Sequence, residues 1–332
     1  MRIRIALSRL MAVTSHQWVL AKAIRFGFLP FLLVAFFSPV SDAQPHTYVS
    51  ALGNDGNPCS RTAPCRTFNI AVSVTDNGGD VVALDSGEFG HVDIKRSVSL
   101  IAAPGVYAGI TTANDGIDII AGSADTIVLR GLTVNNQPHN DRQPPGPAVP
   151  GILFLSGGTL HVESCIVNGF FEGGGLVFMS AGSLEVKDSI FRGNGTGIAL
   201  LSPSGIAFAA VDHVRLERNL TGLFAAGWCR VSVHSSIASN NGDGFFAGGT
   251  GGSIELNLEN CLSSNNRGKG IFSSSLAGTC VVRVSNSTVT NNGIGLAVAG
   301  DQSITVLLSR GNNTVEGNTV GINGPVASYT AK

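Results

Sequence analysis

The chain has 332 residues, 43 of them glycine, and a formal charge of −1. Charged side chains make up only 13% of it, and no run of Lys or Arg follows the first segment. Nucleic acid is therefore a poor candidate partner, because phosphate backbones are bound by clustered cations. Glycine and asparagine at this density predict turns that recur regularly along the chain.

The first 43 residues differ in composition from the rest. Five cations, Arg2, Arg4, Arg9, Lys22 and Arg25, precede an apolar run, "GFLPFLLVAFFSPV", which leads into Ser41-Asp42-Ala43. This order is typical of a secretory signal peptide, and the run is short for a spanning helix. We expect cleavage after Ala43, with an uncleaved anchor as the alternative. Cleavage would leave 16 cations, 21 anions, a formal charge of −5 and no integral membrane domain.

Residues 44–110 are expected to form an N-terminal cap and the first coils of a repeat. Cys59 and Cys65 lie six positions apart in a polar loop with prolines, and an exported protein would join them in a disulfide. The stretch "RTFNIAVSV", residues 66–74, has apolar side chains at the spacing of one helical face, namely Phe68, Ala71 and Val72. We expect a short helix there that covers the open end of a core.

From residue 111 to 324, a glycine followed by an apolar residue recurs along the chain. The intervals are 22 to 26 residues except for one of 35. A period in the twenties over this many units predicts a solenoid. The pairs are Gly116-Ile117, Gly151-Ile152, Gly175-Leu176, Gly197-Ile198, Gly222-Leu223, Gly244-Phe245, Gly270-Ile271, Gly295-Leu296 and Gly321-Ile322.

Each unit contains a second strand with alternating polarity, and several units close with asparagine. Half-buried strands alternate in this way, and Asn tolerates left-handed backbone in tight turns. No helical periodicity interrupts the units, which excludes helical repeats, and the hexapeptide β-helix has a shorter period. The remaining architecture is a parallel β-helix with coils about 4.8 Å apart. The strand positions are Val162, Val186, Val211, Val233, Leu258 and Val284, and the asparagines are Asn194, Asn219, Asn241, Asn266 and Asn292.

These repeats resemble those of the right-handed parallel β-helix proteins of the pectate lyase-like superfamily. The segments "TYVSALGNDGNPCSRTAPCRTFNIAV" and "GGDVVALDSGEFGHVDIKRSVSLIAAPG" are similar to the cap and first coils of secreted members, and the resemblance covers residues 46–324. It implies an all-β, right-handed single domain over residues 44–332, with repeat coils at 111–324 and a C-terminal tail at 325–332. The location would be secreted, periplasmic or on the cell surface. This fold hosts lyases, hydrolases, epimerases and non-catalytic surface proteins, so it leaves the function open.

The stretch "NDGIDII", residues 114–120, is either a turn entering a strand or an acidic pair for sugar chemistry. Asp115 and Asp118 match the two acidic positions of the Asn-Thr-Asp-Gly-x-Asp stretch of polygalacturonase-type hydrolases, although Ala113 and Asn114 depart from it. The companion Asp-Asp, Gly-His-Gly and Arg-Ile-Lys motifs are missing. The pectate lyase set, with its acidic calcium site, is missing too. We therefore expect no metal site and no cofactor.

The 35-residue interval marks an insertion at residues 136–150. It would emerge one layer above Asp115 and bring His139 and Asp141 close to both carboxylates. If the protein is an enzyme, Asp115, Asp118, His139 and Asp141 are its candidate catalytic residues. The alternative is an ordinary proline-rich surface loop.

The outward position after each anchor is apolar in most coils and is phenylalanine in three of them: Phe224, Phe246 and Phe272. An exposed column of this kind would contact sugar rings or a partner chain. Alternatively, a loop covers it, or the inward and outward positions are exchanged by a slip of one residue.

The sequence thus favours an exported, non-catalytic β-helix protein that binds a polysaccharide or a protein surface partner through these phenylalanines. A polysaccharide lyase or glycoside hydrolase is the alternative, and a purely structural solenoid is third. Four further cysteines fall inside the repeats without zinc-site spacing, and we expect them to be buried. They are Cys165, Cys229, Cys261 and Cys280.

Overall fold

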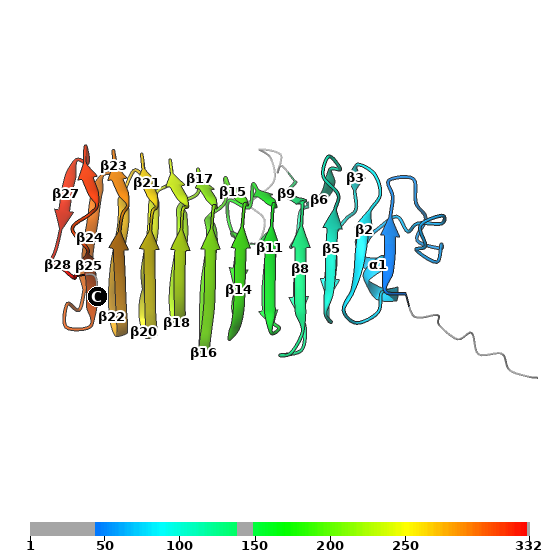
Figure 1. Ribbon diagram of the computed structural model, residues 1–332, viewed down its shortest axis with the longest axis horizontal. Helices are drawn as coiled ribbons and strands as arrows, with labels where there is room; N and C mark the ends of the chain where they lie inside the picture. Colours follow the sequence, from blue (N-terminus) through cyan, green and yellow to red (C-terminus); the bar gives the residue numbers. More distant parts are fainter. Residues whose placement is uncertain (1–43, 138–148, 331–332) are drawn as a thin grey trace, which may run out of the picture. The chain divides into compact units, whose positions relative to one another are not determined.

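The computed structural model describes residues 44–137 and 149–330. In these residues, 28 strands and one short helix form a parallel β-solenoid of about nine turns. The strands stack side by side along one axis (Figure 1), and each pairs in parallel with its counterpart one coil away. None of the helices in this part of the chain is long and apolar enough to cross a membrane. The predicted all-β solenoid is confirmed.

Each coil has three faces. The Gly-apolar face begins with the repeated glycine, the charged face carries the alternating strands, and the short-strand face lies along the top of Figure 1. The Gly-apolar face contains β4 (Val92–Ile94), β7 (Ile117–Ile120), β10 (Ile152–Ser156), β13 (Gly174–Phe178), β24 (Ile294–Gly300) and β27 (Val320–Asn323).

The charged face contains β1 (His46–Val49), β2 (Gly79–Ala83), β5 (Val98–Ala102), β8 (Thr126–Arg130), β11 (Thr159–Glu163), β14 (Gly182–Lys187), β25 (Thr305–Ser309) and β28 (Val326–Ser328). Four long strands bend from the Gly-apolar face into the charged face: β16 (Thr196–Asp212), β18 (Thr221–His234), β20 (Asp243–Glu259) and β22 (Lys269–Ser285).

The short-strand face contains β3 (Gly87–Glu88), β6 (Ala108–Thr112), β9 (Leu132–Asn136), β12 (Ile166–Asn168), β15 (Ile190–Arg192), β17 (Arg215–Glu217), β19 (Ile237–Ser239), β21 (Leu262–Ser264), β23 (Thr288–Thr290) and β26 (Thr314–Glu316). These ten strands form a separate parallel sheet that closes the third side of the core.

The register of the sheet follows the sequence repeat. The apolar residues after the repeated glycines pair in a single column from Ile117 to Ile322. The column from Val162 to Val284 pairs in the same way on the charged face. Both columns point inward and are buried along most of their length, so they build one continuous core.

The repeated glycine is required by close packing between coils. A Cβ added at Gly197, Gly222 or Gly244 would lie 2.4–2.5 Å from the carbonyl oxygen of the glycine in the next coil. Carbon and oxygen atoms cannot approach so closely without moving the backbone. The glycine column therefore sets how tightly adjacent coils can stack.

The five asparagines that close the coils form a buried ladder, which corrects their predicted backbone conformation. The residue before each of them takes the left-handed conformation, for example Asn240 with φ 59°. The asparagines themselves point inward and are at most 3% exposed. In each pair of coils, a backbone N–H donates to the next asparagine Oδ1, as from Asn219 to Asn241 at 2.9 Å and from Asn241 to Asn266 at 2.9 Å. Asn318 extends the ladder to the last coil.

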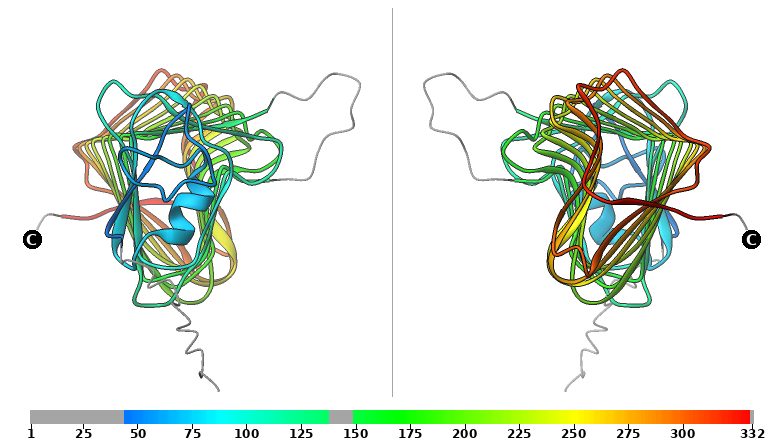
Figure 2. Two further views of the ribbon diagram at one scale, coloured as in Figure 1. Left: turned by 90° about the vertical axis from the view of Figure 1, so that its right-hand side faces the viewer. Right: turned by 90° about the vertical axis from the view of Figure 1, so that its left-hand side faces the viewer.

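The N-terminal end is covered as predicted. The helix α1 (Phe68–Val74) lies across the opening of the coils (Figure 2), and Phe68, Ala71 and Val72 are its buried residues. Its N-cap Thr67 accepts a hydrogen bond from the N–H of Ile70. The predicted disulfide joins Cys59 and Cys65 in the preceding loop.

At the C-terminal end, apolar side chains of the last coil are exposed to solvent. Val320 and Ile322 on β27 are 43% and 54% exposed. Part of the expected tail forms β28, where Val326 pairs with Leu307 of β25. The four cysteines within the repeats are free and buried, as predicted.

Candidate functional site

Two groups of side chains share the outward column of the Gly-apolar face. The sheet register places Asp93, Asp118, Leu153, Val177, Ala199, Phe224, Phe246, Phe272 and Ala297 on successive coils. Carboxylates occupy the N-terminal end of this column and phenylalanines the C-terminal half. Asp118 and Phe224 are four coils apart, about 19 Å at 4.8 Å per coil.

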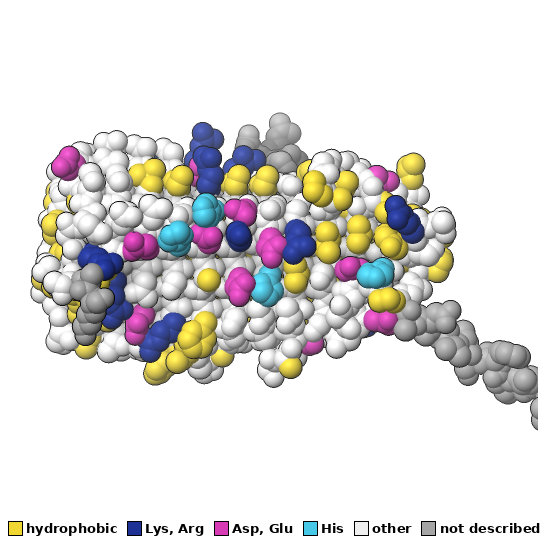
Figure 3. Space-filling model, in the orientation of Figure 1, with side chains coloured by type: hydrophobic (Ala, Val, Ile, Leu, Met, Phe, Trp, Pro, Cys, Tyr) yellow, Lys and Arg dark blue, Asp and Glu magenta, His cyan; other side chains and the backbone are white. Residues whose placement is uncertain are grey.

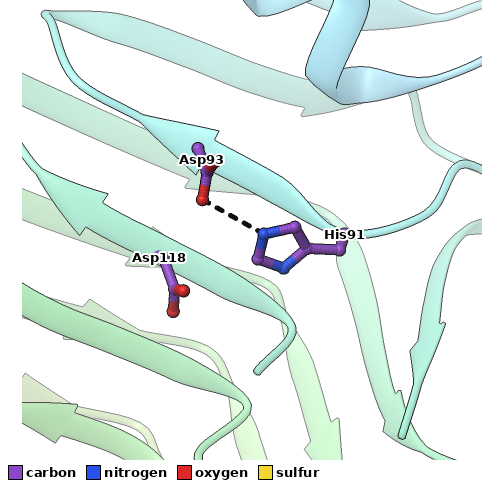
Figure 4. Close-up of side chains that lie close together, drawn as sticks. All are labelled: His91, Asp93 and Asp118. Carbon is purple, nitrogen blue, oxygen red and sulfur yellow. Dashed lines mark hydrogen bonds and ion pairs between the residues drawn. The ribbon is translucent and has the colours of Figure 1, made fainter. Parts of the chain in front are cut away.

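The carboxylate cluster consists of His91, Asp93, Asp115 and Asp118. His91 precedes β4, and its side chain lies near those of Asp93 on β4 and Asp118 on β7 (Figure 4). Its Nδ1 is 2.8 Å from the carbonyl oxygen of Asp115, and its Nε2 is 3.1 Å from Asp93 Oδ1. The structure thus brings together both predicted carboxylates and adds a histidine and a third carboxylate.

Both ring nitrogens of His91 face oxygen acceptors, so the arrangement favours the doubly protonated imidazolium. Burial works against that charge, but the bonds to Asp115 and Asp93 and the charge of Asp118 outweigh burial and raise the pKa of His91 above its usual 6.5. The imidazolium balances part of the negative charge of the cluster.

Asp118 is the member of the cluster whose ionised form is least favourable. Burial, followed by repulsion from Asp115, raises the pKa of Asp118 above its usual 3.8, although His91 opposes this. Its Oδ1 is buried and has no hydrogen-bond partner among the described residues. An ionised carboxylate with an unpaired buried oxygen is unfavourable, and such groups occur preferentially at functional sites.

The cluster also bears on metal binding. The ligand atoms of His91, Asp93 and Asp118 lie within 4.8 Å of one another, and these are donor types that divalent cations use. A metal would require neutral imidazole and would replace one of the two contacts that the His91 nitrogens make here. The cluster contains three carboxyl groups and one histidine, so it can bind protons or a cation.

Phe224, Phe246 and Phe272 form a Phe ladder. Their ring centroids are 4.9 Å and 4.6 Å apart, and all three side chains are partly exposed. The neighbouring Phe245 points inward and is fully buried, so the predicted inward and outward assignment is correct. Lys269 Nζ lies 4.6 Å from the Phe272 ring centroid and 3.8 Å from Asp243 Oδ2.

A hollow of about 460 Å³ adjoins the N-terminal end of the Phe ladder. Phe224, Ala199 and Val177 line it from the strands of the Gly-apolar face. Phe171 and Leu220 line it from turns and are 54% and 55% exposed. This hollow was not predicted, because the residue after each coil's closing position varies in type, as in Phe171, Gly195 and Leu220.

His91 and Asp93 were also missed, although one signal was present. Asp93 lies 25 residues before Asp118, which is one coil period, and the two are paired in the sheet. Two proposed catalytic residues, His139 and Asp141, lie outside the described residues.

The charged face differs from the Gly-apolar face. Its acidic, basic and histidine side chains gather in its centre (Figure 3). Several of them pair between adjacent coils, as in Arg130–Glu163 at 2.7 Å and His161–Glu185 at 3.0 Å. Since these charges are already paired, they act as ladders between coils, where exposed pairs add modest stability.

The family model described as "Right handed beta helix region" matches residues 150–320. The chain belongs to the right-handed β-helix family. Among solved structures, this β-helix protein is similar to the crystal structure of pectate lyase Pel9A, with a TM-score of 0.61 and 17% sequence identity over 88% of this chain and 83% of that one. At this identity the likeness shows the pectate lyase-like fold alone. No curated protein matches the sequence.

Proposed function

We propose that the protein is an exported, non-catalytic glycan-binding protein that holds a polysaccharide along the Gly-apolar face. The observation that carries this proposal is the Phe ladder, whose three aromatic rings stand partly exposed on successive coils. Aromatic rings bind the apolar C–H surface of sugars, and the ladder offers a free ring side at Phe224, supported by the two rings stacked behind it. The similar solved structure is named as a pectate lyase, which supports a polysaccharide as the ligand.

Export is part of the same proposal. The disulfide between Cys59 and Cys65 suits an oxidising compartment. The proposed signal peptide, residues 1–43, lies outside the described residues.

Affinity electrophoresis in gels that contain acidic or neutral polysaccharides tests the proposal. At least one polysaccharide should retard the protein, and Phe246→Ala should reduce that retardation, because it interrupts the Phe ladder. Phe208→Ala is the matched control, since Phe208 is 54% exposed on the charged face. A folded protein that no polysaccharide retards, or equal loss in both variants, would refute the proposal.

The carboxylate cluster favours a second candidate function, a polysaccharide lyase or hydrolase. Burial, followed by repulsion from Asp115, raises the pKa of Asp118, and a carboxyl group that keeps its proton more readily is suited to act as a general acid. Incubation with the same polysaccharides, followed by assays of reducing ends and unsaturated products, separates the two functions. Turnover that Asp118→Asn abolishes would establish the enzyme and overturn the non-catalytic proposal.

A further inference from the structure

The hollow beside the Phe ladder bears on which sugar is bound, and this step rests on the proposed glycan-binding function. Phe246 stacks between Phe224 and Phe272, with ring centroids 4.9 Å and 4.6 Å away. Phe224 ends the ladder, because the residue paired with it on the preceding coil is Ala199. A methyl group cannot cover an aromatic ring, so one side of Phe224 is left free toward the hollow that it lines.

The hollow is lined by both apolar and polar surface. Phe171 and Leu220 line it from turns, and Phe224 lines it from β18. Thr196 and Thr221 also line the space. A volume of about 460 Å³ lies within the range of small-ligand sites, and a sugar ring offers both an apolar C–H surface and hydroxyls.

The charge of the residues that line the hollow favours neutral sugars over acidic ones. Among the described residues that line it, within 44–137 and 149–330, Glu172 is the one charged side chain and none is Lys or Arg. Proteins bind carboxylates through Arg or Lys, and an unpaired carboxylate beside Glu172 would be repelled. Farther along the same face, Lys269 is engaged by Asp243 at 3.8 Å, and the carboxylate cluster adds negative charge at the other end.

We infer that the hollow binds a neutral sugar ring of a polysaccharide, stacked on the free side of Phe224, and that it excludes polyuronates. Phe171 and Leu220 hold the opposite side of the ring, and Glu172 accepts hydrogen bonds from its hydroxyls. Phe246 and Phe272 support Phe224 from behind.

The test compares retardation by neutral glucans, mannans, xylans and galactans with retardation by polygalacturonate. A neutral polysaccharide should bind, and Phe224→Ala should weaken that binding about tenfold, the loss expected for one stacking contact. Phe224→Leu keeps apolar bulk without an aromatic ring and should show the same loss with an unchanged circular dichroism spectrum. Phe208→Ala should bind as the wild type does.

The outcomes test the neutral-sugar inference separately from the proposed glycan-binding function. Polygalacturonate binding that Phe224→Leu removes would overturn the neutral-sugar inference and leave glycan binding standing. Neutral binding that is unaffected by Phe224→Leu would overturn the inference as well, because the hollow would not be the site. A folded protein that binds no polysaccharide would overturn both.

Discussion

Replacing Asn241 with alanine should destabilise the solenoid by about 4 kcal/mol. The Asn241 side chain donates to the carbonyl of Leu216 at 2.9 Å and to Asn266 Oδ1 at 3.1 Å. Its own oxygen accepts from the backbone N–H of Asn219 at 2.9 Å. The variant leaves the buried N–H of Asn219 without that acceptor, which costs about 2 kcal/mol, and loses the two donated hydrogen bonds, which cost about 1 kcal/mol each.

Urea unfolding followed by circular dichroism measures this loss. With a slope of about 3 kcal/mol/M, the midpoint should fall by about 1.3 M. Asn257→Ala is the matched control, because Asn257 lies on the charged face, where its side chain accepts one hydrogen bond of 3.3 Å from Arg283. It should change stability by about 0.5 kcal/mol or less. If both variants unfold at the same urea concentration, the buried ladder does not stabilise the coils as argued.

Two further predictions concern the carboxylate cluster and the turns. At pH 7, Asp118→Asn should melt at a higher temperature than the wild type, because burial and Asp115 raise the pKa of Asp118. The wild-type carboxyl stabilises the fold below its unfolded pKa near 3.8, and this stability is lost as pH rises through its higher folded pKa. The variant's higher melting temperature should therefore disappear in acid. A lower melting temperature of the variant at pH 7 would contradict this. Gly252→Ala should destabilise by at least about 2 kcal/mol, because φ is +88° and a Cβ would lie 2.0 Å from a carbonyl oxygen of the previous coil. Gly251→Ala, with nothing within 4 Å of its Cβ, is the control in the same unfolding assay, and equal effects would count against the packing argument.

The fold was predictable because the sequence repeats once per coil. One glycine per coil and one inward apolar residue after it set the register, and the structure pairs these residues in the predicted column. The cap was predictable for a related reason, since three apolar residues at helical spacing have one place to be buried.

The asparagines were harder to interpret. Asn is common both in left-handed turns and in buried hydrogen-bonded ladders, so composition alone cannot separate the two roles. Here the left-handed turn belongs to the preceding residue, such as Arg218 with φ 56°, and the asparagine turns inward.

The candidate site was only partly predictable. Asp115 and Asp118 stand out because they are adjacent in sequence to a repeat anchor. His91 joins them from the previous coil through a turn, and its contact with the Asp115 carbonyl depends on how that turn bends. The hollow depends on Phe171 and Leu220, which occupy a turn position whose residue type varies from coil to coil, so no repeated pattern marks it.

The number of coils between the carboxylate cluster and the Phe ladder sets the distance between these two groups. Gaining one whole coil between Asp118 and the hollow would preserve the stacking of the coils, because every coil contacts its neighbours through the same pairings. It would nevertheless change the separation of the two groups by about 4.8 Å. Lineages of this protein could therefore adjust the length of ligand that spans both groups by duplicating coils, without altering a residue that touches it.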